Sequence, residues 1–153
     1  MVSVLIPVYN YNVIELVSEV HKQLELCDIL FEIKCLDDAS AIEFQTQKQV
    51  VEELIHTSYL ISKTNQGRIA TRQQLADAAL YDYVIFLDAD VLPKSNDFIK
   101  NYLNYIDSNY DAIYGGIAYK DEKPASDSML RWAYGKRNEN VSALIRNKTP
   151  YKS

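Results

Sequence analysis

Cysteine is scarce in this chain, which has only 2 Cys among 153 residues. Cys27 and Cys35 lie in apolar surroundings, do not amount to a disulfide framework and lack the spacing of a metal site. A reducing compartment is therefore the simpler expectation, and the cytoplasm is the expected location.

Glycine-rich motifs are also missing. The chain has 4 Gly, and none of the patterns GxSxG, GxxxxGK[ST] or GxGxxG occurs in it. Their absence excludes the nucleophile elbow of hydrolases, the P-loop and the dinucleotide-binding fingerprint.

The sequence has no long apolar run and no excess of positive charge. No apolar stretch approaches the roughly 20 residues that span a bilayer, and the N-terminus lacks the pattern of a secretory signal. The formal net charge of −5 argues against nucleic acid or an anionic membrane surface as a general partner. The length fits a single domain over residues 1–153.

Short apolar runs that predict strands alternate with amphipathic segments that predict helices. The expected strands cover residues 2–6, 29–36, 59–61, 84–87 and 112–118. The expected helices cover about 12–24, 42–56, 68–80 and 93–106. This alternation predicts an α/β fold with a mostly parallel sheet and helices on both faces. The pattern weakens after Lys120, where only 127–134 suggests a helix.

Polar residues gather where the expected strands end. The first four strands are followed by Pro7-Val8-Tyr9-Asn10, Asp37-Asp38, Asn65-Gln66-Gly67 and Asp88-Ala89-Asp90. In open parallel sheets, ligands bind at the carboxyl ends of the strands. Carboxylates that meet there repel one another unless a cation or hydrogen-bond donors compensate, so this arrangement indicates a binding site.

The triplet Asp88-Ala89-Asp90 follows the most apolar strand. If the chain stays extended, alternation puts Asp88 and Asp90 on the same side. Two carboxylates together with substrate phosphates suit Mg²⁺ or Mn²⁺. The alternative is an ordinary turn, because Asp is common after strands.

Asp37 and Asp38 leave two roles open. A carboxylate at a strand end can accept hydrogen bonds from the base or the ribose of a nucleotide. It can also cap the helix that begins near Ser40. We expect one residue to take each role, and the sequence does not say which.

The segment that begins at Gly67 combines a turn with positive charge. Gly67 stands where the backbone must turn or approach a ligand closely. Arg68 and Arg72 lie four residues apart on one helical face, and guanidinium groups pair well with a diphosphate. We assign Arg72 to the site and Arg68 to a solvated surface.

Taken in order, these segments resemble the inverting family 2 glycosyltransferases of the GT-A fold. The matching stretches are 4–10, 36–40, 65–72 and 86–90. Together they span most of residues 2–93, and this ordered set is far more specific than any one motif. One departure is Thr71-Arg72-Gln73, where the family often has Ala-Arg-Asn.

The resemblance implies a Rossmann-like GT-A core over residues 1–118 that binds a nucleotide-sugar donor, with a UDP-sugar preferred. It implies a donor site made of Pro7, Tyr9, Asp37, Asp38, Gly67, Arg72 and Asp88. Asp38 is expected at the base, with Pro7 and Tyr9 lining the nucleoside pocket. Asp88 is expected at the ribose, and Asp90, with Asp88, at Mn²⁺ or Mg²⁺.

The resemblance also implies an acceptor, either a carbohydrate or a lipid-linked molecule, and a general base that deprotonates its hydroxyl. No acid after residue 118 matches the Glu-Asp pair that often supplies this base, so we expect the base to be absent from this chain. Residues 119–153 are expected to be the start of an acceptor-side region or a flexible tail.

The expected activity is metal-dependent, inverting sugar transfer, in polysaccharide biosynthesis. A donor-binding module without catalysis is the alternative. The inner face of the membrane remains an alternative location, and an oligomer remains open.

Overall fold

The structure, a computed structural model, describes residues 1–148. The chain divides into two compact units, the first covering Met1–Ser108 and the second beginning at Asn109. The strand expected at 112–118 is wrong, because these residues form no regular secondary structure. Gly115 and Gly116 lie in the middle of that stretch, and glycines have no side chain to pack on a sheet, which weakens a strand.

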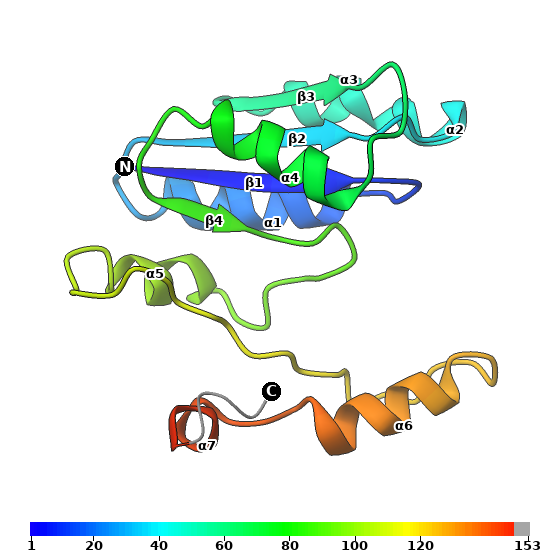
Figure 1. The fold of residues 1–153 in the computed structure, drawn as a ribbon, viewed down its shortest axis with the longest axis vertical. Coiled ribbons are helices and arrows are strands. Elements are labelled where there is room, and N and C mark those ends of the chain that lie inside the picture. Colours follow the sequence, from blue (N-terminus) through cyan, green and yellow to red (C-terminus); the bar gives the residue numbers. More distant parts are fainter. Residues whose placement is uncertain (149–153) are drawn as a thin grey trace. The chain divides into compact units, whose positions relative to one another are not determined.

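A parallel sheet forms the centre of the first unit (Figure 1). Its strands are β1 (Val2–Val8), β2 (Phe31–Asp37), β3 (Thr57–Ile61) and β4 (Val84–Phe86), and they lie in the order β3-β2-β1-β4. Every neighbouring pair is parallel. The carboxyl ends of all these strands therefore meet at one edge, which we call the rim.

Helices cover both faces of this sheet, as the alternating sequence predicts. They are α1 (Ile14–Glu25), α2 (Ile42–Gln45), α3 (Gln47–Glu52), α4 (Arg68–Asp77) and α5 (Phe98–Leu103). Helix α4 lies on the opposite side of the strands from α1 (Figure 1). The single helix expected at 42–56 is wrong: it is divided at Thr46, whose Oγ1 donates to the carbonyl of Glu43 and competes with the helical hydrogen bonds.

The core explains why β1 is mostly apolar on both of its faces. Val4 and Ile6 face the main core, which also contains side chains of α1, α3 and α5. Leu5 points the other way and packs with Leu36 and Leu75, the latter on α4. Because β1 is buried on both faces, it has no solvent-facing side, and its polar residue Ser3 is itself buried and hydrogen-bonded to Glu32.

A buried polar cluster closes the end of the sheet opposite the rim. Glu32 Oε1 accepts hydrogen bonds from Ser3 Oγ at 2.7 Å and from the Leu80 N–H at 2.6 Å. Its other oxygen pairs with Lys34. The Tyr81 N–H in turn donates to Ser3 Oγ at 3.1 Å. The cluster thereby fixes the connection from α4 to β4.

We expect Glu32→Gln to lower the free energy of unfolding at neutral pH by about 1–2 kcal/mol, because Lys34 loses its partner. Burial alone raises the pKa of Glu32, but the bonds from Lys34, Ser3 and Leu80 outweigh burial and lower it overall. The stabilisation from Glu32 is therefore complete above the unfolded pKa of about 4.3 and is lost as pH falls through the lower folded pKa. Denaturant titrations at neutral and acidic pH measure this. The same acid dependence in wild type and variant would contradict it.

The second unit contains α6 (Met129–Asn138) and α7 (Ala143–Lys148). The helix expected at 127–134 is confirmed, although it begins later and extends further. Glu139 accepts a hydrogen bond from Tyr119 and pairs with Arg131 at 2.7 Å, which joins the end of α6 to the segment before it. No helix within residues 1–148 is long and apolar enough to cross a membrane.

Candidate functional site

The side chains of Asp37 and Asp38 form their hydrogen bonds on opposite faces of the sheet, because successive side chains of an extended chain alternate. Asp37 Oδ1 accepts from the Ser40 N–H at 2.6 Å, and its Oδ2 accepts from the Tyr59 hydroxyl at 2.8 Å. The Asp37 residue has an exposed fraction of 0%. The capping role left open by the sequence is wrong, because α2 begins at Ile42 and its N-terminus has no side-chain cap; Asp37 instead holds the turn at Ser40.

Asp38 holds the loop that leads into α4. Its two carboxylate oxygens accept the N–H groups of Gln66 and Gly67, both at 2.8 Å. Gly67 has φ 85°, a left-handed conformation that favours glycine, and it directly precedes α4. The turn predicted at Gly67 is thus present, and Asp38 places the first turn of α4 at the rim.

Asp88 lies beside two arginines from the first turns of α4. Arg72 makes an ion pair with Asp88 Oδ1, and Arg68 Nη2 lies 3.2 Å from each carboxylate oxygen. From the sequence, Arg68 is expected on a solvated surface. Its side chain is 70% exposed, yet it reaches the same carboxylate as Arg72. A carboxylate between two guanidinium groups leaves a net positive charge, which suits an anionic ligand.

Arg72 is the more firmly held of the two arginines. Its side chain is 30% exposed, and its guanidinium carbon lies 5.2 Å from the centroid of the Phe86 ring. Its Nε is buried and has no hydrogen-bond partner in the described part of the chain. Phe86 and Asp88 both point toward α4, so β4 and α4 together fix the direction of this guanidinium.

Asp90 differs from Asp88 in having no such partners. The strand ends at Phe86 and the chain turns at residues 89–90, so the condition that β4 stays extended through Asp90 is not met. Asp90 is exposed, and no hydrogen bond or ion pair involves its carboxylate among residues 1–148. A free carboxylate at the rim is a hard oxygen ligand of the kind that Mn²⁺ and Mg²⁺ bind.

A protein-only metal cage is not present in the described chain. Residues 1–148 contain no group of three Asp, Glu, His or Cys side chains that could hold a metal ion. Mg²⁺ typically uses one or two carboxylates and completes its shell with water and substrate phosphates. The residues present fit that donor set: Asp90 is available, whereas the charge of Asp88 is already compensated by arginine.

The loop after β1 carries an exposed aromatic ring to the rim. Tyr9 is 55% exposed, and Pro7, within β1, is half-buried. Asn10 fixes this loop to the loop after β2: its N–H donates to Ser40 Oγ at 2.8 Å, and its Oδ1 accepts from the Ala41 N–H at 2.9 Å. The ring of Tyr9 is therefore exposed on an anchored loop and suits stacking on a planar group.

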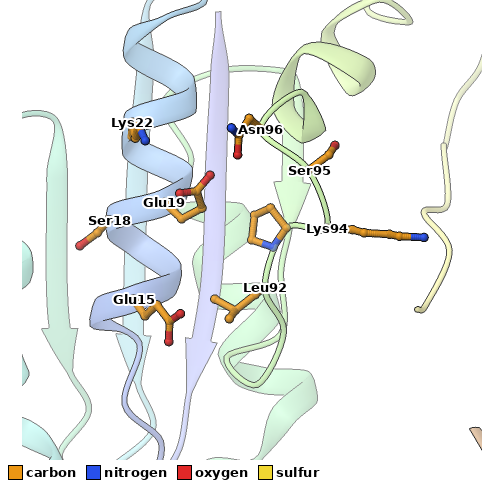
Figure 2. Close-up of a pocket in the computed structure, with 9 residues that line it drawn as sticks. Glu15, Ser18, Glu19, Lys22, Leu92, Lys94, Ser95 and Asn96 are labelled. Atoms are coloured by element: carbon orange, nitrogen blue, oxygen red, sulfur yellow. The ribbon is translucent and has the colours of Figure 1, made fainter. Parts of the chain in front are cut away.

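A separate groove of about 430 Å³ lies between α1 and the segment that follows the Asp88-Ala89-Asp90 triplet (Figure 2). Glu15, Glu19 and Lys22 of α1 line one side of it, and residues 92–96 line the other. Acids and lysines both contribute to its wall. It therefore lacks the positive charge that a diphosphate requires, and we assign it no part in the site.

Two residues that support the rim, Gln47 and Tyr59, are not among the site residues expected from the sequence. Gln47 is 4% exposed and lies four residues before the buried Val51 in the broken helix. A polar residue at an apolar position of a helix is a detectable signal, because buried amides need hydrogen-bond partners. Tyr59 gave no such signal, since tyrosine is common in strands.

Comparison with known proteins concerns the family and the fold of this chain. Residues 3–152 match the family described as glycosyl transferase family 2. A search of curated proteins found no match. S. aureus TarS is 25% identical over 69% of this chain and 19% of its own length, with a TM-score of 0.58.

Two further solved structures carry ligands. S. aureus TarS 1-349 in complex with UDP-GlcNAc is 24% identical and covers 69% of this chain and 31% of that one, with a TM-score of 0.59. The mannosyltransferase PcManGT from Pyrobaculum calidifontis, in complex with GDP-Man and Mn²⁺, is 18% identical and covers 71% and 32%, with a TM-score of 0.58. The chain thus matches no more than about a third of each of these structures. The fold and the family match together show that this chain belongs to glycosyl transferase family 2 and has the GT-A type of α/β sheet.

Proposed function

We propose that the rim binds a nucleotide-diphosphate sugar and that the chain is the donor-binding part of a sugar transferase. The observation that carries this proposal is the arrangement of Arg68 and Arg72 beside Asp88, where the first turn of α4 reaches the ends of the strands. Two similar structures hold UDP-GlcNAc and GDP-Man, which supports a donor of this class. A UDP-sugar is the donor we propose.

The nucleoside end of the donor lies, in this proposal, against the loops after β1 and β2. Tyr9 stacks on the base, Pro7 lines the pocket, and Asp38 accepts a hydrogen bond from the base. Asp38 already accepts two backbone N–H groups. Each carboxylate oxygen has a second lone pair, so a further donor is accommodated without breaking these bonds.

The diphosphate end lies against α4. The guanidinium groups of Arg68 and Arg72 and the N-terminal end of the helix place positive charge where the leaving group gains negative charge. Asp88 orients the arginines and accepts a hydrogen bond from the ribose. Asp90 would hold Mn²⁺ or Mg²⁺, which when bound neutralises charge on the departing diphosphate.

The reaction we propose is a single displacement at the anomeric carbon, with inversion. The oxygen of an acceptor hydroxyl forms the new bond to that carbon, the bond to the diphosphate breaks, and a general base takes the hydroxyl proton. No residue of the described chain is assigned as this base. The acceptor is a carbohydrate or a lipid-linked molecule.

Thermal unfolding with added nucleotides tests the proposal directly. UDP with Mn²⁺ at about a hundred times its dissociation constant should stabilise the chain by about 2.7 kcal/mol and raise Tm by several degrees. Mn²⁺ alone and UMP serve as controls, because neither provides both the cation and the diphosphate. If UDP, GDP and their sugars all leave Tm unchanged with either metal, the donor site is refuted.

A donor-binding module without catalysis is the second candidate, and it rests on the lack of an assigned general base. Release of UDP from a UDP-sugar in the presence of acceptor separates the two. Donor binding without UDP release would favour the module, whereas turnover would establish the transferase.

A further inference from the structure

A buried amide joins α3 to the loop after β1. Gln47 is 4% exposed, and its Oε1 accepts the Val13 N–H at 2.7 Å. Its Nε2 donates to the carbonyl of Tyr11 at 2.9 Å and to the hydroxyl of Tyr59, also at 2.9 Å. Both amide hydrogens and the amide oxygen are used, so this side chain has one well-defined orientation.

The hydroxyl of Tyr59 extends this hydrogen-bond network to the loop after β2. Tyr59 is fully buried and donates to Asp37, which in turn accepts the Ser40 N–H. Burial, followed by the bond to Asp37, raises the pKa of the Tyr59 phenol, so the group stays protonated and remains a donor. A continuous chain of hydrogen bonds therefore runs from Gln47 to Ser40.

The two loops that this network reaches contain strained backbone. Asn10 has φ 48° and Ala39 has φ 61°, in the left-handed region that side chains disfavour. Such conformations persist only where the surroundings determine them. The bond from Asn10 to Ser40 closes the network between the loops, which include the rim residues Tyr9 and Asp38.

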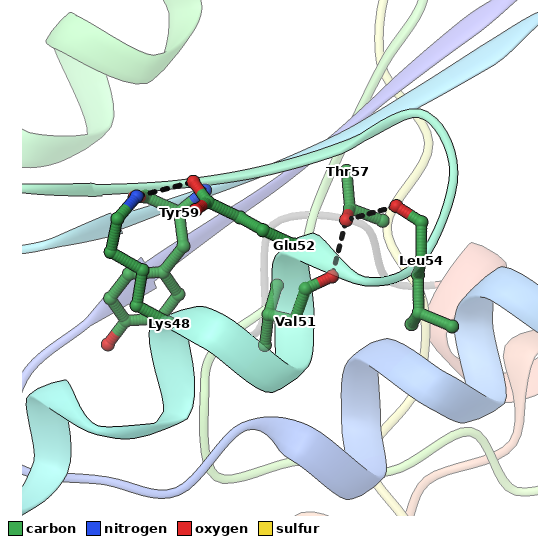
Figure 3. Close-up of polar contacts among 6 residues, drawn as sticks. All are labelled: Lys48, Val51, Glu52, Leu54, Thr57 and Tyr59. Carbon is green, nitrogen blue, oxygen red and sulfur yellow. Dashed lines mark hydrogen bonds and ion pairs between the residues drawn. The ribbon is translucent and has the colours of Figure 1, made fainter.

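Helix α3 is also attached to β3 by contacts that do not involve the side-chain hydrogen bonds of Gln47 and Tyr59 (Figure 3). Lys48 and Glu52 form an ion pair and bond to the backbone of Tyr59, Lys48 to its carbonyl and Glu52 to its N–H. Thr57 Oγ1 donates to the carbonyl of Val51, near the end of α3, and to that of Leu54, just after it.

We propose that Gln47 and Tyr59 are positioning residues for the donor, which hold loops 9–13 and 38–41 in the binding geometry without touching the ligand. This rests on the proposed function of the rim. Loops fixed in advance lose less conformational freedom when a ligand binds, so the network contributes to affinity through order in the free protein. Removing one member loosens loops that the ligand must then order.

The variants Tyr59→Phe and Gln47→Leu test this, with Thr57→Val as the matched control. Thr57→Val also removes a hydroxyl that joins β3 to α3, but that hydroxyl lies outside the network. Calorimetry with UDP and Mn²⁺, well below Tm, should show affinity reduced about tenfold for Tyr59→Phe and Gln47→Leu and unchanged for Thr57→Val. Amide hydrogen exchange at Val13 and Ser40 should accelerate in the first two variants only.

Several results would overturn the inference. Wild-type UDP affinity in Tyr59→Phe would do so, as would an equal loss of affinity in Thr57→Val, which would indicate general destabilisation. If wild-type protein itself does not bind UDP, the proposed function fails and hydrogen exchange decides alone. In that case faster exchange confined to the network variants supports loop positioning, and unchanged exchange at Val13 and Ser40 refutes it.

Discussion

Asp90→Asn should weaken Mn²⁺-supported binding of UDP by roughly a hundredfold, with no change in Tm. The amide keeps the shape of the side chain but loses the negative charge that a hard cation requires. Asp90 is exposed and has no hydrogen bond or ion pair within residues 1–148, so its replacement removes no interaction of the folded chain. The effect should therefore appear in ligand binding alone.

Calorimetry with Mn²⁺ and with a chelator measures this effect. Asp82→Asn is the matched control, because Asp82 is also exposed but precedes β4 at the opposite end of the strand. It makes the same change in net charge away from the rim and should leave UDP affinity unaltered. An equal loss in both variants would indicate a general charge effect. Unchanged binding in Asp90→Asn would remove Asp90 from the metal site.

Arg72→Met should reduce UDP affinity about fiftyfold, whereas Arg68→Met should reduce it only a few-fold. Both guanidinium groups meet Asp88, but Arg72 is 30% exposed and lies against the Phe86 ring, while Arg68 is 70% exposed. A charge fixed in a less solvated position is screened less by water and salt. Methionine keeps an apolar side chain of similar length while removing the guanidinium that lies over the Phe86 ring.

Calorimetry across a range of salt concentrations measures the two arginines separately. Loss of Arg72 should also leave Asp88 with only the exposed Arg68 as partner, so the negative charge of Asp88 then acts against the diphosphate. The double change Arg72→Met with Asp88→Asn should recover part of the lost affinity. Equal effects of the two single arginine variants would show that exposure does not rank them.

At the rim, the alternation of side chains along a strand determines which residues meet only once the tertiary packing is known. Alternation along an extended chain requires Asp37 and Asp38 to point in opposite directions, and the sequence contains that fact. It does not say which of them faces α3 and which faces α4, because alternation in β2 shows which residues share a face but not which helix covers that face. The packing of the helices decides this: Asp37 accepts a hydrogen bond from the Tyr59 hydroxyl, and Asp38 accepts one from the Gly67 N–H.

The sequence by itself determined the features that depend on neighbouring residues. Apolar runs of strand length alternating with helical patterns predicted the parallel sheet, and the polar residues after each run predicted the rim. Whether an apolar run becomes a strand also depends on a partner elsewhere in the chain. The run at 112–118 is apolar enough for a strand, but it contains two glycines, and no strand of the described chain pairs with it.

Only the tertiary structure decided which side chains meet. It brought Arg68, although its side chain is 70% exposed, to the carboxylate of Asp88, and it joined Gln47 to Tyr59 and both to the loops of the rim. These contacts connect different elements, so they depend on strand order, on register and on the face that each helix covers. Periodicity in the sequence records which residues of an element are buried, but not which element buries them.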